Sequence, residues 1–226
     1  NIHTEIVKNV IRKYGDFDEK YFANIEENLR QYETYVAKAC EYLDGIIKAM
    51  DDGRIWDNTM VIILSDHGCG IGEKPGEKAY GIYAYDYSIK VFSFFLYPKL
   101  LPAGREITTQ VRSIDIMPTV LDILKITPDD NYKRLKGKSL LGIIEGRDKE
   151  DRVAFSETGG LDGPHPSPYG PNVKCVRTKD WKLIYNTTTK KKELYDLVSD
   201  PKEENNLIDK YPHIAAKLWE EIKENS

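Results

Sequence analysis

The segment TMVIILSDHG, residues 59–68, joins an apolar run to Asp66, His67 and Gly68. The run at 59–64 is rich in β-branched side chains, which is typical of a strand buried on both faces of a parallel sheet. In open α/β sheets, ligands bind beyond the carboxyl ends of the strands, and Asp66 and His67 follow such an end directly. The segment therefore predicts an α/β fold with a ligand site after this strand.

The residues before the strand carry the pattern of one long amphipathic helix. Between Asp18 and Met50, apolar side chains recur every three or four positions, which places them in one stripe. A long helix followed by a buried strand is half of an α/β unit, so this pattern supports the same fold class.

Downstream, the pattern predicts shorter elements. We expect a second buried strand at 91–97, a helix near 114–124 and a short strand at 153–157. Four glycines and four prolines make 159–171 a loop. Short strands separated by short turns then predict an antiparallel meander, followed by a closing amphipathic helix, at 173–177, 181–185, 193–197 and 211–223. We therefore expect two units, 1–158 and 159–226.

Composition excludes several classes of protein. The 226 residues carry a formal net charge of −4, which argues against a nucleic-acid partner. No apolar run approaches the roughly 20 residues of a membrane span. Three well-separated cysteines do not form a disulfide framework and favour a reducing compartment such as the cytoplasm. The sequence allows an oligomer and does not determine the oligomeric state.

Asp66 and His67 are candidate metal ligands. A carboxylate is a hard oxygen ligand for a divalent cation, and a neutral imidazole adds a nitrogen. Such ions take roughly four to eight donors, so the other ligands would come from elsewhere in the fold. The alternative is that Asp-His-Gly only forms a turn, because short motifs of this kind are of low specificity.

The long segment 65–90 adds the charged residues Glu73, Lys74, Glu77 and Lys78. A lysine near a metal could contact an anionic substrate and stabilise developing charge. Taken alone, however, this charge pattern is more typical of a solvated loop.

Four segments together resemble, in the same order, the sulfatase family of the alkaline-phosphatase-like superfamily. They are YLDGII with DNTMVIILSDHG (42–47 and 57–68), YDYSIKV (85–91), DIMPTVL (115–121), and RTKDWKLI with ELYDL and DPKEENNL (177–184, 193–197 and 200–207). The resemblance implies a partial mixed sheet flanked by helices, with a small C-terminal antiparallel subdomain and a terminal helix. Residues 1–158 would then be the C-terminal half of the catalytic domain.

The resemblance also implies roles for single residues. Asp66 and His67 match the pair that coordinates the active-site cation, calcium first, with magnesium or manganese as alternatives. Lys78 is the best match to the lysine that contacts sulfate, and Lys74 stays open because the loop length departs from the family's commonest spacing. Two further departures are Tyr80, where some relatives have histidine, and Phe92, where the family usually has proline.

Family members carry an N-terminal Cys/Ser-x-Pro-x-Arg motif whose first residue becomes formylglycine. Neither Cys40, Cys69, Cys175 nor any serine begins such a motif here. We therefore expect a fragment that is inactive alone, whose partner is the missing N-terminal half and whose substrate is a small anionic ester. Two alternatives are a phosphatase, phosphodiesterase or phosphonate hydrolase of the same superfamily, and a non-catalytic α/β binding module.

Overall fold

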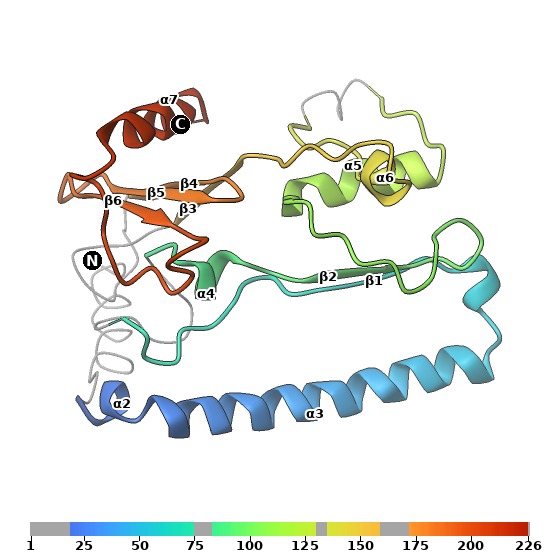
Figure 1. Cartoon of the computed structure of the whole chain (residues 1–226). Coiled ribbons are helices and arrows are strands. Elements are labelled where there is room, and N and C mark those ends of the chain that lie inside the picture. The colour runs from blue at the N-terminus through green and yellow to red at the C-terminus, as the bar shows by residue number, and fades with distance from the viewer. Residues whose placement is uncertain (1–18, 75–82, 130–134, 159–171, 226) are drawn as a thin grey trace, which may run out of the picture.

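The computed structural model describes residues 19–74, 83–129, 135–158 and 172–225. Within these residues the chain forms two antiparallel sheets, one of two strands and one of four, with helices packed around them (Figure 1). The predicted α/β class is confirmed. In the described part of the chain, no helix is both long and apolar enough to cross a lipid bilayer.

The predicted N-terminal helix is two helices, α2 (Glu19–Ala23) and α3 (Ile25–Asp52). Asn24 separates them because its backbone leaves the helical region, with φ −121° and ψ 46°. Its side-chain amide donates to the Lys20 carbonyl at 2.6 Å, an example of how asparagine competes with regular helix hydrogen bonding. The apolar stripe on α3 is real but mostly exposed, and Met50 is its one buried residue.

The strand at the Asp66–His67 segment is β1 (Val61–Leu64), and it pairs with β2 (Ser93–Leu96). The residues of β1 are typical of a strand buried on both faces of a parallel sheet, but its described neighbour β2 is antiparallel to it. The connection between the strands contains the single-turn helix α4 (Asp86–Ile89) instead of a crossover helix, so the chain returns in the opposite direction. With one strand neighbour among the described residues, β1 is only half-buried.

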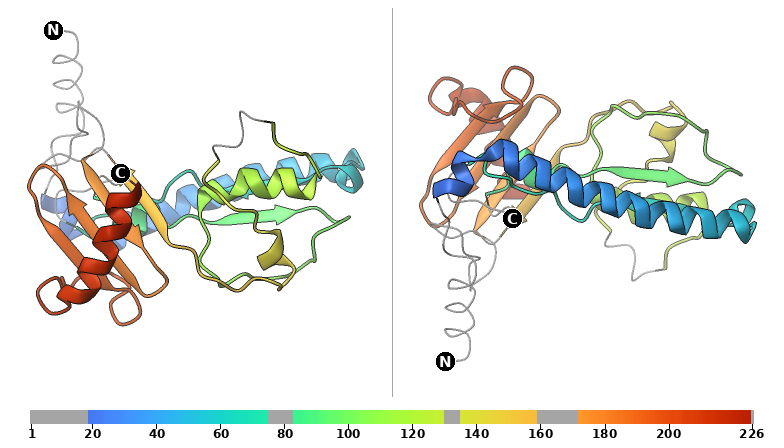
Figure 2. Two further views of the ribbon diagram at one scale, coloured as in Figure 1. Left: turned by 90° about the horizontal axis from the view of Figure 1, so that it is seen from above. Right: turned by 90° about the horizontal axis from the view of Figure 1, so that it is seen from below.

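Helices lie on both sides of this β-ribbon. α3 runs along one side, and α5 (Ile116–Ile123) and α6 (Leu141–Ile144) lie on the other (Figures 1 and 2). Two short 3-10 turns, η1 (Trp56–Asn58) and η2 (Ser113–Asp115), precede β1 and α5. α6 packs against Phe95 of β2 through Leu140, Ile143 and Ile144.

Asp115, the first residue of the DIMPTVL segment, fixes the start of α5 through buried ion pairs and hydrogen bonds. Its carboxylate is fully buried, and it accepts from Arg112 Nη2 at 2.9 Å and pairs with Arg152 Nη1 at 3.0 Å. The Lys138 amide donates to the same carboxylate at 2.9 Å. Thr119, also buried, donates to the Asp115 carbonyl at 2.6 Å. This segment is therefore a structural anchor.

The predicted meander is present as a four-stranded antiparallel sheet in the order β3-β4-β5-β6. Its strands are Ala154–Thr158, Val173–Arg177, Trp181–Asn186 and Lys192–Asp196. The terminal helix α7 (Pro212–Asn225) covers one face through Leu218 and Ile222. β3 precedes the boundary expected at 158/159 and pairs with β4, and the division into two units stays a prediction.

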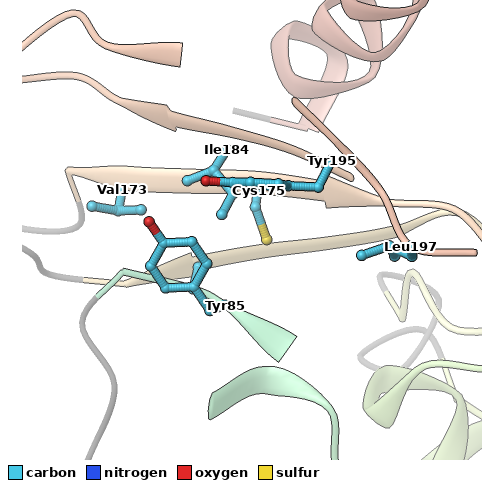
Figure 3. Packing of buried hydrophobic residues seen from close by; sticks show 7 residues of the cluster. Tyr85, Val173, Cys175, Ile184, Tyr195 and Leu197 are labelled. Carbon is cyan, nitrogen blue, oxygen red and sulfur yellow. The ribbon is translucent and has the colours of Figure 1, made fainter. Parts of the chain in front are cut away.

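The opposite face of the sheet packs against the segment that contains α4. Tyr85 lies against Cys175, Ile184 and Tyr195 of three neighbouring strands (Figure 3). Side chains alternate across a strand, so β4, β5 and β6 contribute one set of residues to the α7 face and the other set to the α4 face. The four-stranded sheet is therefore joined directly to the connection between β1 and β2.

Candidate functional site

Asp66 and His67 follow the carboxyl end of β1, as the sequence predicts. The β1–β2 pairing extends one step further, because the Ser65 amide donates to the Phe92 carbonyl at 3.3 Å. The Phe92 amide in turn donates to Ser65 Oγ at 3.3 Å, a bond that proline could not make. Residues 65–68 form what we call the Asp66–His67 turn.

The side chains of the turn converge. His67 Nε2 lies 3.5 Å from Asp66 Oδ2, and the His67 amide donates to Asp66 Oδ1 at 2.9 Å. His67 Nδ1 lies 2.7 Å from the Gly68 carbonyl oxygen, which can only accept a hydrogen bond. Nδ1 therefore carries the proton in the neutral ring, and the lone pair is on Nε2. A carboxylate oxygen and the unprotonated imidazole nitrogen thus lie 3.5 Å apart.

This donor set suits part of a divalent-metal site. With metal–ligand bonds of about 2.0–2.5 Å, neighbouring donors lie about 3–3.5 Å apart, close to the separation of Nε2 and Oδ2. Both side chains are accessible, with 86% of Asp66 and 46% of His67 exposed. The described residues bring no group of three or more His, Cys, Asp or Glu together as a metal cluster. The turn therefore fits a cation as two of its ligands.

Gly68 holds the turn close to α4. Its amide donates to the Ser88 carbonyl at 2.7 Å. A Cβ at this position would lie 2.0 Å from the Tyr87 carbonyl oxygen, so only glycine allows this approach.

Lys78, Glu77 and Tyr80 lie outside the described residues. Lys74, the alternative substrate lysine, is already engaged: its ammonium donates to the Glu203 carbonyl and lies 4.8 Å from the Tyr85 ring centroid. Glu73 is also occupied locally, since it accepts from the Ile71 amide at 2.7 Å.

A pocket of about 300 Å³ opens beside the turn. Its polar lining includes His67, Cys69, Glu73 and Lys90. Lys90 is a cation that lines the same pocket as His67, and it lies in the YDYSIKV segment rather than in the loop around Lys78 where a substrate lysine was expected.

A buried ion cluster lies between α4 and the four-stranded sheet. Lys182 Nζ is fully buried and lies 2.9 Å from Asp86 Oδ1 and 2.8 Å from Glu203 Oε1. Arg177 Nη2 approaches Asp86 Oδ2 at 2.9 Å. Nothing in the local sequence pattern indicated this cluster, although both Lys182 and Glu203 fall inside segments that resemble the sulfatase family.

The cluster shifts the pKa values of its carboxyl groups in opposite directions. Burial by itself raises the pKa of Asp86, but hydrogen bonds and charge from Arg177 and Lys182 outweigh it and hold that pKa below 3.8. Burial raises the pKa of Glu203 above 4.5, and Lys182 only partly offsets this. Asp86 is therefore the more firmly ionised of the two acids.

Two family models together cover most of the chain. The model described as "Sulfatase" matches residues 4–126, and that described as "N-sulphoglucosamine sulphohydrolase, C-terminal" matches residues 80–226. The chain belongs to the sulfatase family. An ulvan-active sulfatase of Formosa agariphila is 29% identical over 195 residues, which are 84% of this chain and 37% of that protein. The chain thus spans less than two-fifths of this relative's length.

Solved structures agree on the sulfatase fold. A 2-O GAG sulfatase matches with a TM-score of 0.75 at 23% identity, covering 89% of this chain and 43% of that one. A phosphonate monoester hydrolase of Agrobacterium radiobacter matches with a TM-score of 0.66, also at 23% identity, covering 84% and 39%. At these identities the likeness concerns the fold alone, and it spans enzymes with different ester substrates.

Proposed function

We propose that the intact protein hydrolyses a small anionic sulfate ester, with Asp66 and His67 as two ligands of a divalent cation. Calcium is the first candidate, with magnesium or manganese as alternatives. The observation that carries this proposal is the convergence of Asp66 Oδ2 and His67 Nε2 at the end of β1 in a chain of the sulfatase family. When bound, such an ion polarises an ester oxygen and steadies a nucleophile.

The rest of the site is proposed to come from two places. Lys78 would contact the sulfate group and offset its charge, a role that rests on the resemblance of its segment. The upstream part of the same protein would supply the formylglycine nucleophile and the remaining metal ligands, since two donors do not complete a site.

The same upstream part is proposed to cover the exposed apolar stripe of α3. Leu29, Val36 and Ile46 are among its exposed side chains, and Tyr42 beside the stripe has 79% of its surface accessible. Phe94 of β2 is exposed as well. Apolar areas of this extent usually pack against another protein segment, which supports a partner in the missing half.

The test is turnover of an aryl sulfate by the protein with its upstream sequence. Asp66→Ala should reduce kcat/KM at least about a hundredfold, because it removes a metal ligand. Asp209→Ala, which removes an exposed carboxylate distant in sequence, should have no effect. Unchanged turnover in Asp66→Ala would overturn the proposal. Turnover of an aryl phosphate or phosphonate in place of the sulfate would favour the other hydrolases of the superfamily, and no metal binding at all would favour a binding module.

A further inference from the structure

We propose that Glu203 is a positioning residue through which the four-stranded sheet holds the Asp66–His67 turn in its metal-binding geometry. The role in metal binding rests on the proposed function, whereas the positioning itself is a property of the described chain.

Glu203 contacts the connection between the Asp66–His67 turn and β2 at two residues, Asp86 and Lys74. Its Oε2 accepts from the Asp86 amide at 2.6 Å, at the first residue of α4. Its main-chain carbonyl accepts from the Lys74 ammonium. Only 1% of Glu203 is exposed, and its backbone lies in the left-handed region with φ 55°. A non-glycine residue in that region is held there by its surroundings, which is the case for a residue with this many partners.

α4 passes this constraint to the turn. The Asp86 amide and the Ser88 carbonyl belong to residues two positions apart in the same helical turn, and that carbonyl accepts from the Gly68 amide. The approach of Gly68 to Tyr87 leaves no room even for a Cβ, so a displacement of α4 must displace Gly68. Gly68 is bonded in turn to the His67 ring through its carbonyl.

The four-stranded sheet also binds α4 through the Asp86 side chain. The Asp86 carboxylate is bound by Arg177 and Lys182, which project from β4 and β5. Lys74 adds a contact from the other side of the segment, with its ammonium 5.7 Å from the Tyr195 ring centroid on β6. Replacing a buried ion pair by apolar side chains is often neutral for stability, so stability alone does not account for this arrangement. We therefore assign to these ion pairs the role of holding α4 in place.

The experiment compares Glu203→Gln with Glu204→Gln in the intact protein. Both remove one negative charge from the same turn, but Glu204 is exposed. Hydrogen exchange of the Gly68 amide is the first measurement, and the dissociation constant for calcium by calorimetry is the second. Glutamine keeps one acceptor oxygen but loses the charge and the second acceptor, so Glu203→Gln should raise the exchange rate of the Gly68 amide and weaken calcium binding by up to about tenfold. Glu204→Gln should match the wild type in both.

A second variant separates positioning from stability. The pair Lys182→Met with Glu203→Leu removes these two charges together and leaves Asp86 paired with Arg177, but it leaves the Asp86 amide without its acceptor. It should be more stable than Lys182→Met, which leaves Glu203 charged and unpaired, while still losing Gly68 protection. Wild-type protection of the Gly68 amide in this double variant would overturn the positioning role. The proposed function fails separately, if Asp66→Asn leaves calcium binding intact, and that result does not alter the hydrogen-exchange readout.

Discussion

The amide of Gly68 donates to the carbonyl of Ser88 at 2.7 Å, and this single bond joins the Asp66–His67 turn to helix α4. Through α4 the turn is connected to a buried ion cluster and to the four-stranded sheet. A candidate site that is largely exposed is thereby built on a rigid support, which is what a metal-ligand pair requires.

Replacement of Gly68 tests how closely the turn depends on α4. Gly68→Ala places a Cβ 2.0 Å from the Tyr87 carbonyl oxygen, so the backbone must move. We expect a loss of about 1–3 kcal/mol in the free energy of unfolding. The control is Gly142→Ala, whose Cβ would meet only Asp148 at 3.4 Å and should change stability by less than about 1 kcal/mol. Equal urea midpoints for the two variants would show that the contact is unimportant.

Lys182→Met tests the buried ion cluster. The variant leaves Asp86 and Glu203 buried beside each other without their shared ammonium. We expect destabilisation of about 3–5 kcal/mol, the usual cost of breaking a buried pair from one side. Lys179→Met is the matched control, because that side chain is 63% exposed and its ion pair with Asp151 is long, at 3.8 Å. A change of less than about 1 kcal/mol is expected there, and denaturant unfolding measures both.

Stability should fall on acidification because of Asp115 and Asp86. Burial alone would raise the pKa of Asp115, but Arg112, the Lys138 amide and Arg152 outweigh it and hold that pKa below 3.8. A carboxyl with a lowered pKa in the folded state adds stability above its unfolded pKa, and that stability is lost as the pH falls through the folded pKa.

The corresponding measurement is the melting temperature as a function of pH. Asp115→Asn should be less stable than the wild type near neutrality, and the difference should shrink as the pH falls below about 4. Glu203 acts with the opposite sign, since its raised pKa makes folding weaken as the pH rises above 4.5. A difference between Asp115→Asn and the wild type that stays constant with pH would contradict the assignment to Asp115.

The 226-residue chain alone should not hydrolyse a sulfate ester. Its sequence holds no Cys/Ser-x-Pro-x-Arg motif, and its described residues offer two converging metal donors. An aryl sulfate assay with the intact protein as the positive control measures this. Turnover by the isolated chain that Asp66→Ala abolishes would mean that the nucleophile and the other ligands lie within these residues.

Local pattern was sufficient for much of the fold. The strand predicted at 173–177 is β4 residue for residue, and the closing helix is found within two residues of its predicted ends. Both have strong periodicity and turns on either side, so local signals decide them. The same holds for the place of Asp66 and His67 after β1.

Long-range contacts were not predictable in this way. The pairing of Asp86 with Lys182 spans 96 residues, and the bond from the Asp86 amide to Glu203 spans 117. α4 itself is a single turn, too short to produce a helical period. The residues of β2 predict a buried strand but not its direction, and its antiparallel pairing with β1 is seen only in the structure. The role of Lys78 stays a prediction.

Calcium titration of the intact protein tests the central claim most directly. The wild type should bind one ion per chain, and Asp66→Asn and His67→Ala should each weaken the dissociation constant at least about tenfold, while Asp209→Asn should leave it unchanged. Calcium binding by both turn variants with the wild-type dissociation constant would contradict the assignment of Asp66 and His67 as metal ligands.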